Sequence, residues 1–205
     1  MSARRLHRLL PKSAAFVAPL AALALALALP GTAPAATQER PDHELRLMLE
    51  KAILEADSFE DRFDAEVWLM DMSRRLQSRV PDDRERLHLL KAIHYEASKA
   101  GLAPELVLAV INVESNFDRF AISRVGAQGL MQIMPFWLKE IPEAGDNLFD
   151  IRTNLRFGCT ILKHYLDRER GDFNRALARY NGSVGKVWYP NRVFDTLRKR
   201  WYRVR

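Results

Sequence analysis

Cysteine is almost absent from this chain, which carries one, Cys159, in 205 residues. A single thiol excludes an internal disulfide and cannot build a zinc site. The five histidines show no His-Glu-x-x-His or other paired spacing, and no glycine fingerprint for phosphate is present. We therefore expect neither a metal nor a cofactor. Apolar neighbours at helical spacing predict that Cys159 is a buried core thiol.

Strand-like alternation of useful length is also missing, and helical periodicity dominates the sequence. We expect an all-α protein. The predicted helices cover residues 45–54, Ser58 to Leu76, Asp82 to Gly101, Pro104 to Glu114, Leu130 to Glu140, Ile151 to Arg170, Phe173 to Tyr180, and a last segment after Pro190.

The first residues have the pattern of a signal peptide. Four basic residues precede an apolar stretch over 14–29, and an Ala-x-Ala site follows at Ala33-Pro34-Ala35. We expect residues 1–35 to be removed, with cleavage after Ala35 or Ala36. A retained membrane anchor is the alternative, but the stretch is shorter than the roughly 20 apolar residues that span a bilayer.

Such cleavage would remove four basic and no acidic residues, which lowers the formal net charge from +6 to +2. We expect no nucleic-acid partner. The basic residues that remain include Arg192 and a run over 198–205 at the C-terminus. They could meet anionic wall polymer or lipid headgroups, or form a solvated terminal face.

Glu114 closes the apolar helical run over residues 106–113. A carboxyl group at the end of a buried helix loses water, so its neutral form is favoured and it can act as a general acid. The glycine-rich run over 126–135 is a backbone that could approach a saccharide closely. Glycosidases usually pair two carboxylates, but Asp118 follows an apparent exit into a loop and is interpreted as a cap or surface residue.

These segments resemble the soluble lytic transglycosylase (SLT) family. The pair Glu114-Ser115 is similar to its Glu-Ser motif, and residues 129–132 are similar to its Gly-Leu-Met-Gln motif. Further on, Ala178-Arg179-Tyr180-Asn181 resembles the family's Ala-Tyr-Asn motif, with Arg179 where the usual spelling has alanine before tyrosine. The resemblance covers about residues 81–205.

The resemblance implies a lysozyme-like helical domain, related to goose-type lysozyme, over 81–205. Residues 36–80 would be a helical extension of unknown role. The implied reaction cleaves the β-1,4 bond between N-acetylmuramic acid and N-acetylglucosamine in peptidoglycan. A single glutamate, here Glu114, would protonate the leaving oxygen and then deprotonate the C6 hydroxyl, giving a 1,6-anhydromuramoyl end.

The resemblance also implies a set of substrate-binding residues. Ser123 would hydrogen-bond the catalytic carboxyl or the substrate, and the Tyr180 phenol would position Glu114 or the acetamido group. The full set matched to the family is Ser123, Gly129, Met131, Gln132, Tyr180 and Asn181. The aromatic residues Phe136, Trp137, Trp188 and Tyr189 could stack on sugar rings or plug the core.

Two other functions remain open from the sequence. One is a muramidase that lets water reach the anomeric carbon. The other is a wall-binding assembly factor for a secretion or motility machine. In each case we expect a monomer in the periplasm that binds peptidoglycan strands, with residues 36–80 available to a cell-envelope protein partner.

Overall fold

The computed structural model describes residues 62–140 and 147–202, and every regular element in these ranges is a helix. The all-α prediction is thus confirmed for the described part of the chain. The predicted signal peptide, the predicted helix over 45–54 and the start of the helix predicted from Ser58 lie outside it. The elements are α2 (Arg62–Leu76), α3 (Asp83–Lys99), α4 (Pro104–Glu114), α5 (Phe136–Glu140), α6 (Ile151–Arg168), α7 (Phe173–Asn181), α8 (Trp188–Thr196) and the π-helix η2 (Leu197–Trp201).

Most helix boundaries follow local signals in the sequence. Asp82 caps α3 by accepting a hydrogen bond from the amide of Glu85 at 2.7 Å, and Pro104 begins α4. The predicted helix over Leu130–Glu140 is wrong in its first half. There Gln132 adopts a φ of 53° and Gln128 and Ile133 exchange two backbone hydrogen bonds of 2.9 Å, so only α5 is helical.

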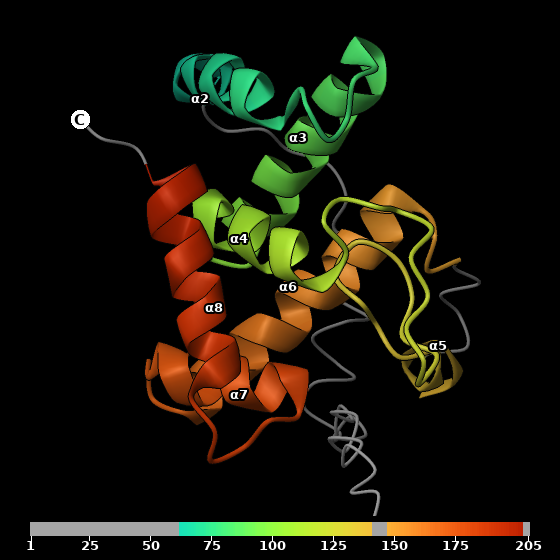
Figure 1. Cartoon of the computed structure of the whole chain (residues 1–205), viewed down its shortest axis with the longest axis vertical. Helices are drawn as coiled ribbons and strands as arrows, with labels where there is room; N and C mark the ends of the chain where they lie inside the picture. Colours follow the sequence, from blue (N-terminus) through green and yellow to red (C-terminus); the bar gives the residue numbers. More distant parts are fainter. Residues whose placement is uncertain (1–61, 141–146, 203–205) are drawn as a thin grey trace, which may run out of the picture. The chain divides into compact units, whose positions relative to one another are not determined.

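The helix α4 lies at the centre of the packing and contacts α3, α8 and η2 (Figure 1). Each of its residues from 106 to 111 is at most 4% exposed, as expected for a helix that is apolar all round. Truncation of Leu108 to alanine should therefore cost about 2–5 kcal/mol of stability. Because α4 is packed tightly in the core, the position of its last residue, Glu114, is fixed.

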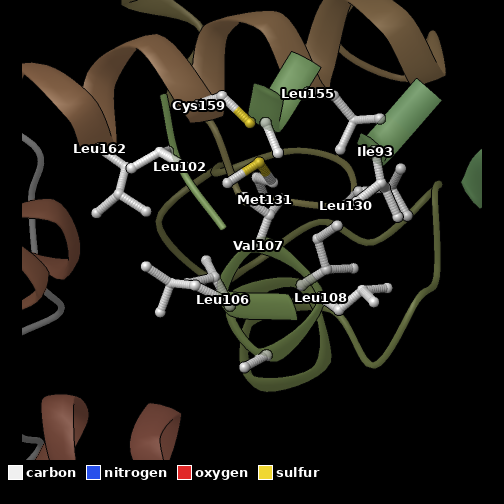
Figure 2. Packing of buried hydrophobic residues seen from close by; sticks show 14 of the residues in the cluster. Ile93, Leu102, Leu106, Val107, Leu108, Leu130, Met131, Leu155, Cys159 and Leu162 are labelled. Atoms are coloured by element: carbon white, nitrogen blue, oxygen red, sulfur yellow. The ribbon is translucent and has the colours of Figure 1, made fainter. Parts of the chain in front are cut away.

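The helix α6 packs on α3 and α7 and carries Cys159 into the same core (Figure 2). The thiol is 1% exposed, which confirms the predicted buried role. Loss of water raises the pKa of Cys159 well above its usual value. This cysteine is therefore a neutral, apolar part of the core.

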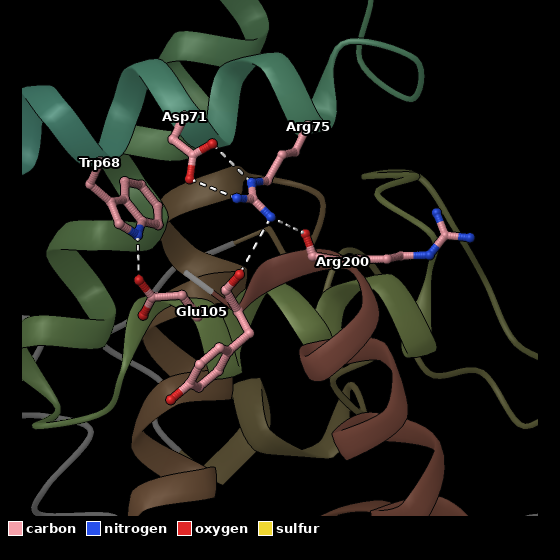
Figure 3. A network of polar contacts seen from close by, with 6 residues as sticks. Trp68, Asp71, Arg75, Glu105 and Arg200 are labelled. Atoms are coloured by element: carbon pink, nitrogen blue, oxygen red, sulfur yellow. Dashed lines mark hydrogen bonds and ion pairs between the residues drawn. The ribbon is translucent and has the colours of Figure 1, made fainter. Parts of the chain in front are cut away.

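The helix α2 is fastened to the helices that follow it (Figure 3). The indole of Trp68 donates to Glu105 at 2.9 Å, and Arg75 donates to the backbone carbonyl of Arg200 at 3.1 Å. Asp71 holds Arg75 through two hydrogen bonds of 3.0 Å. Within the predicted extension 36–80, at least α2 thus packs as part of the same core.

None of the helices described here combines the length and the apolar composition that crossing a bilayer requires.

Candidate active site

Glu114 is the last residue of α4 and lies in a cleft of about 480 Å³. The cleft is bounded by the end of α4, by the loop that follows it and by one face of α8 and η2. Its lining consists of Asn112, Val113, Glu114, Ser115, Asn116, Ala121, Ile122, Ser123, Gln132, Arg192, Thr196 and Arg200. Among these described residues, Glu114 is the only carboxylic acid.

Burial raises the pKa of Glu114 from its usual value near 4.5 to about 7. Three groups act against this effect: hydrogen bonds from Tyr189 and Asn181, and the positive charge of Arg192. The loss of water is the larger influence. Glu114 is therefore poised to exist in both its protonated and its ionised form near neutral pH, as the sequence predicted for a general acid.

Tyr189 holds the Glu114 carboxyl in place. Its hydroxyl donates to Oε1 at 2.5 Å, and its side chain is 1% exposed. Burial, followed by the nearby Glu114, raises the pKa of Tyr189 well above its usual value, so the hydroxyl stays a donor. The sequence offered Tyr189 only as a stacking or core residue, because no local signal links it to a glutamate 75 residues earlier.

Tyr180 does not hydrogen-bond Glu114, which was one of the two roles predicted for it. Its hydroxyl donates instead to the backbone carbonyl of Met131 at 2.8 Å, inside the core. The adjacent Asn181, at the end of α7, does reach Glu114 and hydrogen-bonds it. The other amide atom, Asn181 Oδ1, is buried with no hydrogen-bond partner in the described residues. Of the two motif residues, Tyr180 therefore belongs to the core and Asn181 holds the Glu114 carboxyl group.

The glycine-rich loop is clamped by Asn154 of α6. The Asn154 amide accepts from the Met131 N–H at 2.7 Å and donates to the carbonyls of Gln128 and Leu148 at 2.9 and 2.8 Å. Gly129 has a φ of 75°, and a methyl group there would collide with Asn154 and with the Leu148 carbonyl. The close approach that the glycine allows is therefore to the protein's own chain. Sequence reasoning missed Asn154 because a lone helical asparagine carries no distinguishing signal.

Met131, a predicted cleft residue, belongs to the core instead, and Trp137 takes the core position that was one of its two predicted roles. Met131 is fully buried between α4 and α6 (Figure 2), and its sulfur packs where a side chain at Gly158 would otherwise lie. Trp137 is also fully buried. Neither residue lines the cleft. Trp188 is 51% exposed, but it too lies outside the cleft lining.

Ser123 and Gln132 do line the cleft with Glu114. The Ser123 hydroxyl accepts from the amide of Ala127 at 3.0 Å. The Gln132 side-chain amide donates to the carbonyls of Ala121 and Gly129 at 3.2 and 2.9 Å. Both side chains therefore shape the loop wall.

The chain leaves α4 through a strained turn. Asn116 and Phe117 have φ values of 51° and 71°, which are uncommon for residues other than glycine. Asp118 is exposed and accepts from the amide of Phe120 at 2.9 Å, which confirms its predicted capping role at the surface. This turn directs the chain sharply away from Glu114 and opens the cleft beside it.

Arg179, the residue that departs from the usual motif, pairs with Glu169 at the end of α6. Its side chain is thereby committed to α6 and not to the cleft.

In the described ranges no three histidine, cysteine or acidic side chains come together as ligands for a metal ion.

The sequence is similar to those of known transglycosylases. One relative is a transglycosylase of Enterobacteria phage PRD1, 34% identical over 108 residues, covering 49% of this chain and 40% of the phage protein. Another is a membrane-bound lytic murein transglycosylase C from Photorhabdus laumondii, 28% identical over 134 residues, covering 58% of this chain and 37% of that protein. The chain thus spans about two fifths of the length of these relatives.

Among solved structures, an inactive mutant of the lytic transglycosylase Slt from Pseudomonas aeruginosa is similar at 27% identity. The match covers 60% of this chain and 22% of that one, with a TM-score of 0.44. The family model described as the transglycosylase SLT domain matches residues 91–200. Since that match spans more than half of the 205 residues, the chain belongs to the transglycosylase SLT domain family.

Proposed function

We propose that this protein is a peptidoglycan lytic transglycosylase that cleaves between N-acetylmuramic acid and N-acetylglucosamine and leaves 1,6-anhydromuramoyl ends. The observation that carries the proposal is the state of Glu114. It is a single carboxyl group in a cleft, with its pKa raised to about 7 by burial. Relatives whose names state murein transglycosylase activity support the substrate class.

One carboxyl group with a pKa near 7 suits both halves of this reaction. As an acid, Glu114 gives its proton to the glycosidic oxygen while the C1–O bond breaks. As a carboxylate, it then takes the proton of the C6 hydroxyl while that oxygen bonds to C1. Attack within one sugar ring benefits from orientation and consumes no water.

The supporting residues act on the position of this carboxyl. Tyr189 and Asn181 fix it through neutral donors, which hold its geometry in either protonation state. Ser123 and Gln132 shape the loop across the cleft, where a sugar would bind. Gly129, Met131 and Tyr180 keep that loop on the core and act on the substrate only through it.

The wider setting is part of the same proposal. Residues 1–35 would be a signal peptide cleaved near Ala35 or Ala36, so that the protein acts in the periplasm as a monomer. Residues 81–205 would form the catalytic domain, without a cofactor. Within 36–80, α2 would brace that domain, and residues 36–80 would provide the contact to a cell-envelope protein partner.

The test is mass spectrometry of the muropeptides that the protein releases from purified sacculi, with Glu114→Gln as the matched control. We expect anhydro ends with the unaltered protein and none with the variant. Reducing ends that are one water heavier would make the protein a muramidase. Binding to sacculi without any product from either protein would favour the wall-binding assembly factor.

A further inference from the structure

One wall of the cleft carries two basic side chains with a threonine between them, and the proposed reaction assigns no step to any of the three. Arg192, Thr196 and Arg200 are spaced four residues apart along α8 and η2, and all three line the cleft. This spacing places them on one face of the helix. Facing them across the cleft are the end of α4 with Glu114 and the loop that holds Ser123 and Gln132.

The two guanidinium groups are available to a ligand. Arg192 and Arg200 are both exposed, and no ion pair or side-chain hydrogen bond engages either guanidinium among the described residues. By contrast, the neighbouring Arg198 is paired with Asp195. Since Glu114 is the only acid in the described cleft lining, the cleft carries more positive than negative charge when Glu114 is protonated.

The backbone beneath this row is fixed from α2. Arg75 donates to the carbonyls of Arg200 and Tyr202 at 3.1 and 3.5 Å, and Asp71 holds Arg75 in turn (Figure 3). The Arg200 guanidinium extends away from this network (Figure 3). A π-helix is rare and is often found at functional sites. Here it carries the last cationic side chain of the row into the cleft.

The proposed reaction identifies the anion that would lie beside this row. The sugar attacked at C1 is muramic acid, which bears a lactyl arm on the same ring. That arm ends in a free carboxylate where the strand is stripped, and in a peptide with carboxylates where the stem is intact. Guanidinium groups bind carboxylates through paired hydrogen bonds.

We infer that Arg192, Thr196 and Arg200 form a subsite for carboxylates carried on the lactyl arm of muramic acid. This inference rests on the proposed function, because that reaction brings muramic acid to Glu114. The Thr196 hydroxyl adds a neutral donor between the two charges. The subsite would recognise the muramic acid side of the strand and so set its direction in the cleft.

The experiment measures binding on the catalytically silent Glu114→Gln background. Three fluorescent ligands of equal length are compared: strands with intact stems, strands stripped of stems by an amidase, and uncharged chitooligosaccharides. The test variant adds Arg192→Gln and Arg200→Gln, and the matched control adds Arg198→Gln. Far-UV circular dichroism checks that each variant is folded.

We expect the double variant to lose about 10-fold in affinity for stem-bearing strands and nothing for chitooligosaccharides, since charged hydrogen bonds are the interactions removed. Arg198→Gln should match its parent on all three. The affinity of the Glu114→Gln protein for charged strands should also weaken as the salt concentration rises. The affinity of the double variant should depend less on salt. A loss confined to stripped strands would assign the subsite to the lactyl carboxylate itself.

Equal losses on all three ligands, or no loss on any, would overturn the subsite. Turnover of sacculi by the protein with Glu114 intact separates this result from the fate of the proposed function. Anhydro products together with unchanged binding in the double variant would leave the lyase standing without the subsite. The expected binding pattern without any product would leave the subsite standing without the lyase.

Discussion

Two glutamates at the ends of helices have pKa values that are shifted in opposite directions from the usual value. Glu114 ends α4 and Glu169 caps the end of α6, where the helix dipole disfavours a negative charge in both cases. Hydrogen bonding to Arg179 is the main cause that lowers the pKa of Glu169. Loss of water raises the pKa of Glu114 to about 7. The helix end alone therefore does not decide the acid strength.

The partners of the two carboxyl groups account for the difference. Glu169 has two arginines, with Arg175 Nε at 2.7 Å, and a guanidinium fixes the charge of the carboxylate that it binds. Glu114 has the neutral donors Tyr189 and Asn181. Neutral donors hold a carboxyl group in place while leaving both protonation states accessible. A proton-transfer residue needs the second arrangement, and a structural ion pair needs the first.

Among the substitutions that alter the surroundings of these two glutamates, Tyr189→Phe should have the largest effect on activity. The change removes the 2.5 Å hydrogen bond to Glu114 and leaves the ring in the core. We expect kcat to fall by about 10- to 100-fold, since small displacements of a catalytic group are costly. The hydroxyl lowers the pKa of Glu114, so its removal should raise that pKa and move the alkaline decline of kcat/KM to higher pH.

Steady-state rates on soluble glycan strands across the pH range measure both effects. Tyr180→Phe is a control for loss of a buried hydroxyl, because Tyr180 donates to the Met131 carbonyl and not to Glu114. It should lower stability without moving the pH profile. An unchanged pH profile in Tyr189→Phe would show that the hydroxyl does not tune the acid.

Glu114→Gln should make the protein more stable in alkaline solution. Because the folded pKa of Glu114 is raised, the folded state binds more protons than the unfolded state between about pH 4.5 and 7. Stability contributed by the neutral form is therefore lost as the pH rises through 7. Because the Glu114 side chain is only partly buried, we expect the variant to gain about 2 kcal/mol over the unaltered protein at alkaline pH.

Urea unfolding in acidic and alkaline buffer measures this gain. The difference between the two proteins should shrink as the pH falls toward the unfolded pKa of a glutamate, because Glu114 is then neutral in both states. A difference that does not depend on pH would mean that ionisation of Glu114 costs the fold nothing.

The sequence predicted the position of Glu114 because the signal for it is local. An apolar run followed by an acid describes a buried helix and its end, and α4 begins and ends where Pro104 and Glu114 indicated. The helix start at Asp82 and the buried Cys159 were predicted on the same kind of evidence. Family membership followed from short motifs read in order along the chain.

Contacts between distant segments could not be read in this way. Tyr180 lies near the end of α7 and Tyr189 near the start of α8, and no local signal shows which one reaches Glu114. The apolar pattern of residues 130–134 suggested a helix. A positive φ at Gln132 and the clamp from Asn154 override that pattern through tertiary contacts.

Glu169→Gln should have the opposite pH dependence to Glu114→Gln. Its folded pKa is lowered, so its stabilising effect is present above the unfolded pKa and is lost as the pH falls through the folded value. We expect a lower urea midpoint at neutral pH, with the difference from the unaltered protein shrinking in acid. The pH profile of kcat/KM should not move. A shifted profile would mean that the two glutamates are coupled.

Arg179→Ala restores the usual motif spelling and should have the smallest effect. It removes the guanidinium that contributes most to the low pKa of Glu169, but Arg175 remains at 2.7 Å. Stability at neutral pH should therefore fall less than in Glu169→Gln, and the activity should stay near that of the unaltered protein. Urea midpoints and rates on glycan strands measure both. A large loss of kcat with Tyr180 and Asn181 intact would show that Arg179 aligns the end of α7, so that the ion pair at Glu169 supports Glu114 from a distance.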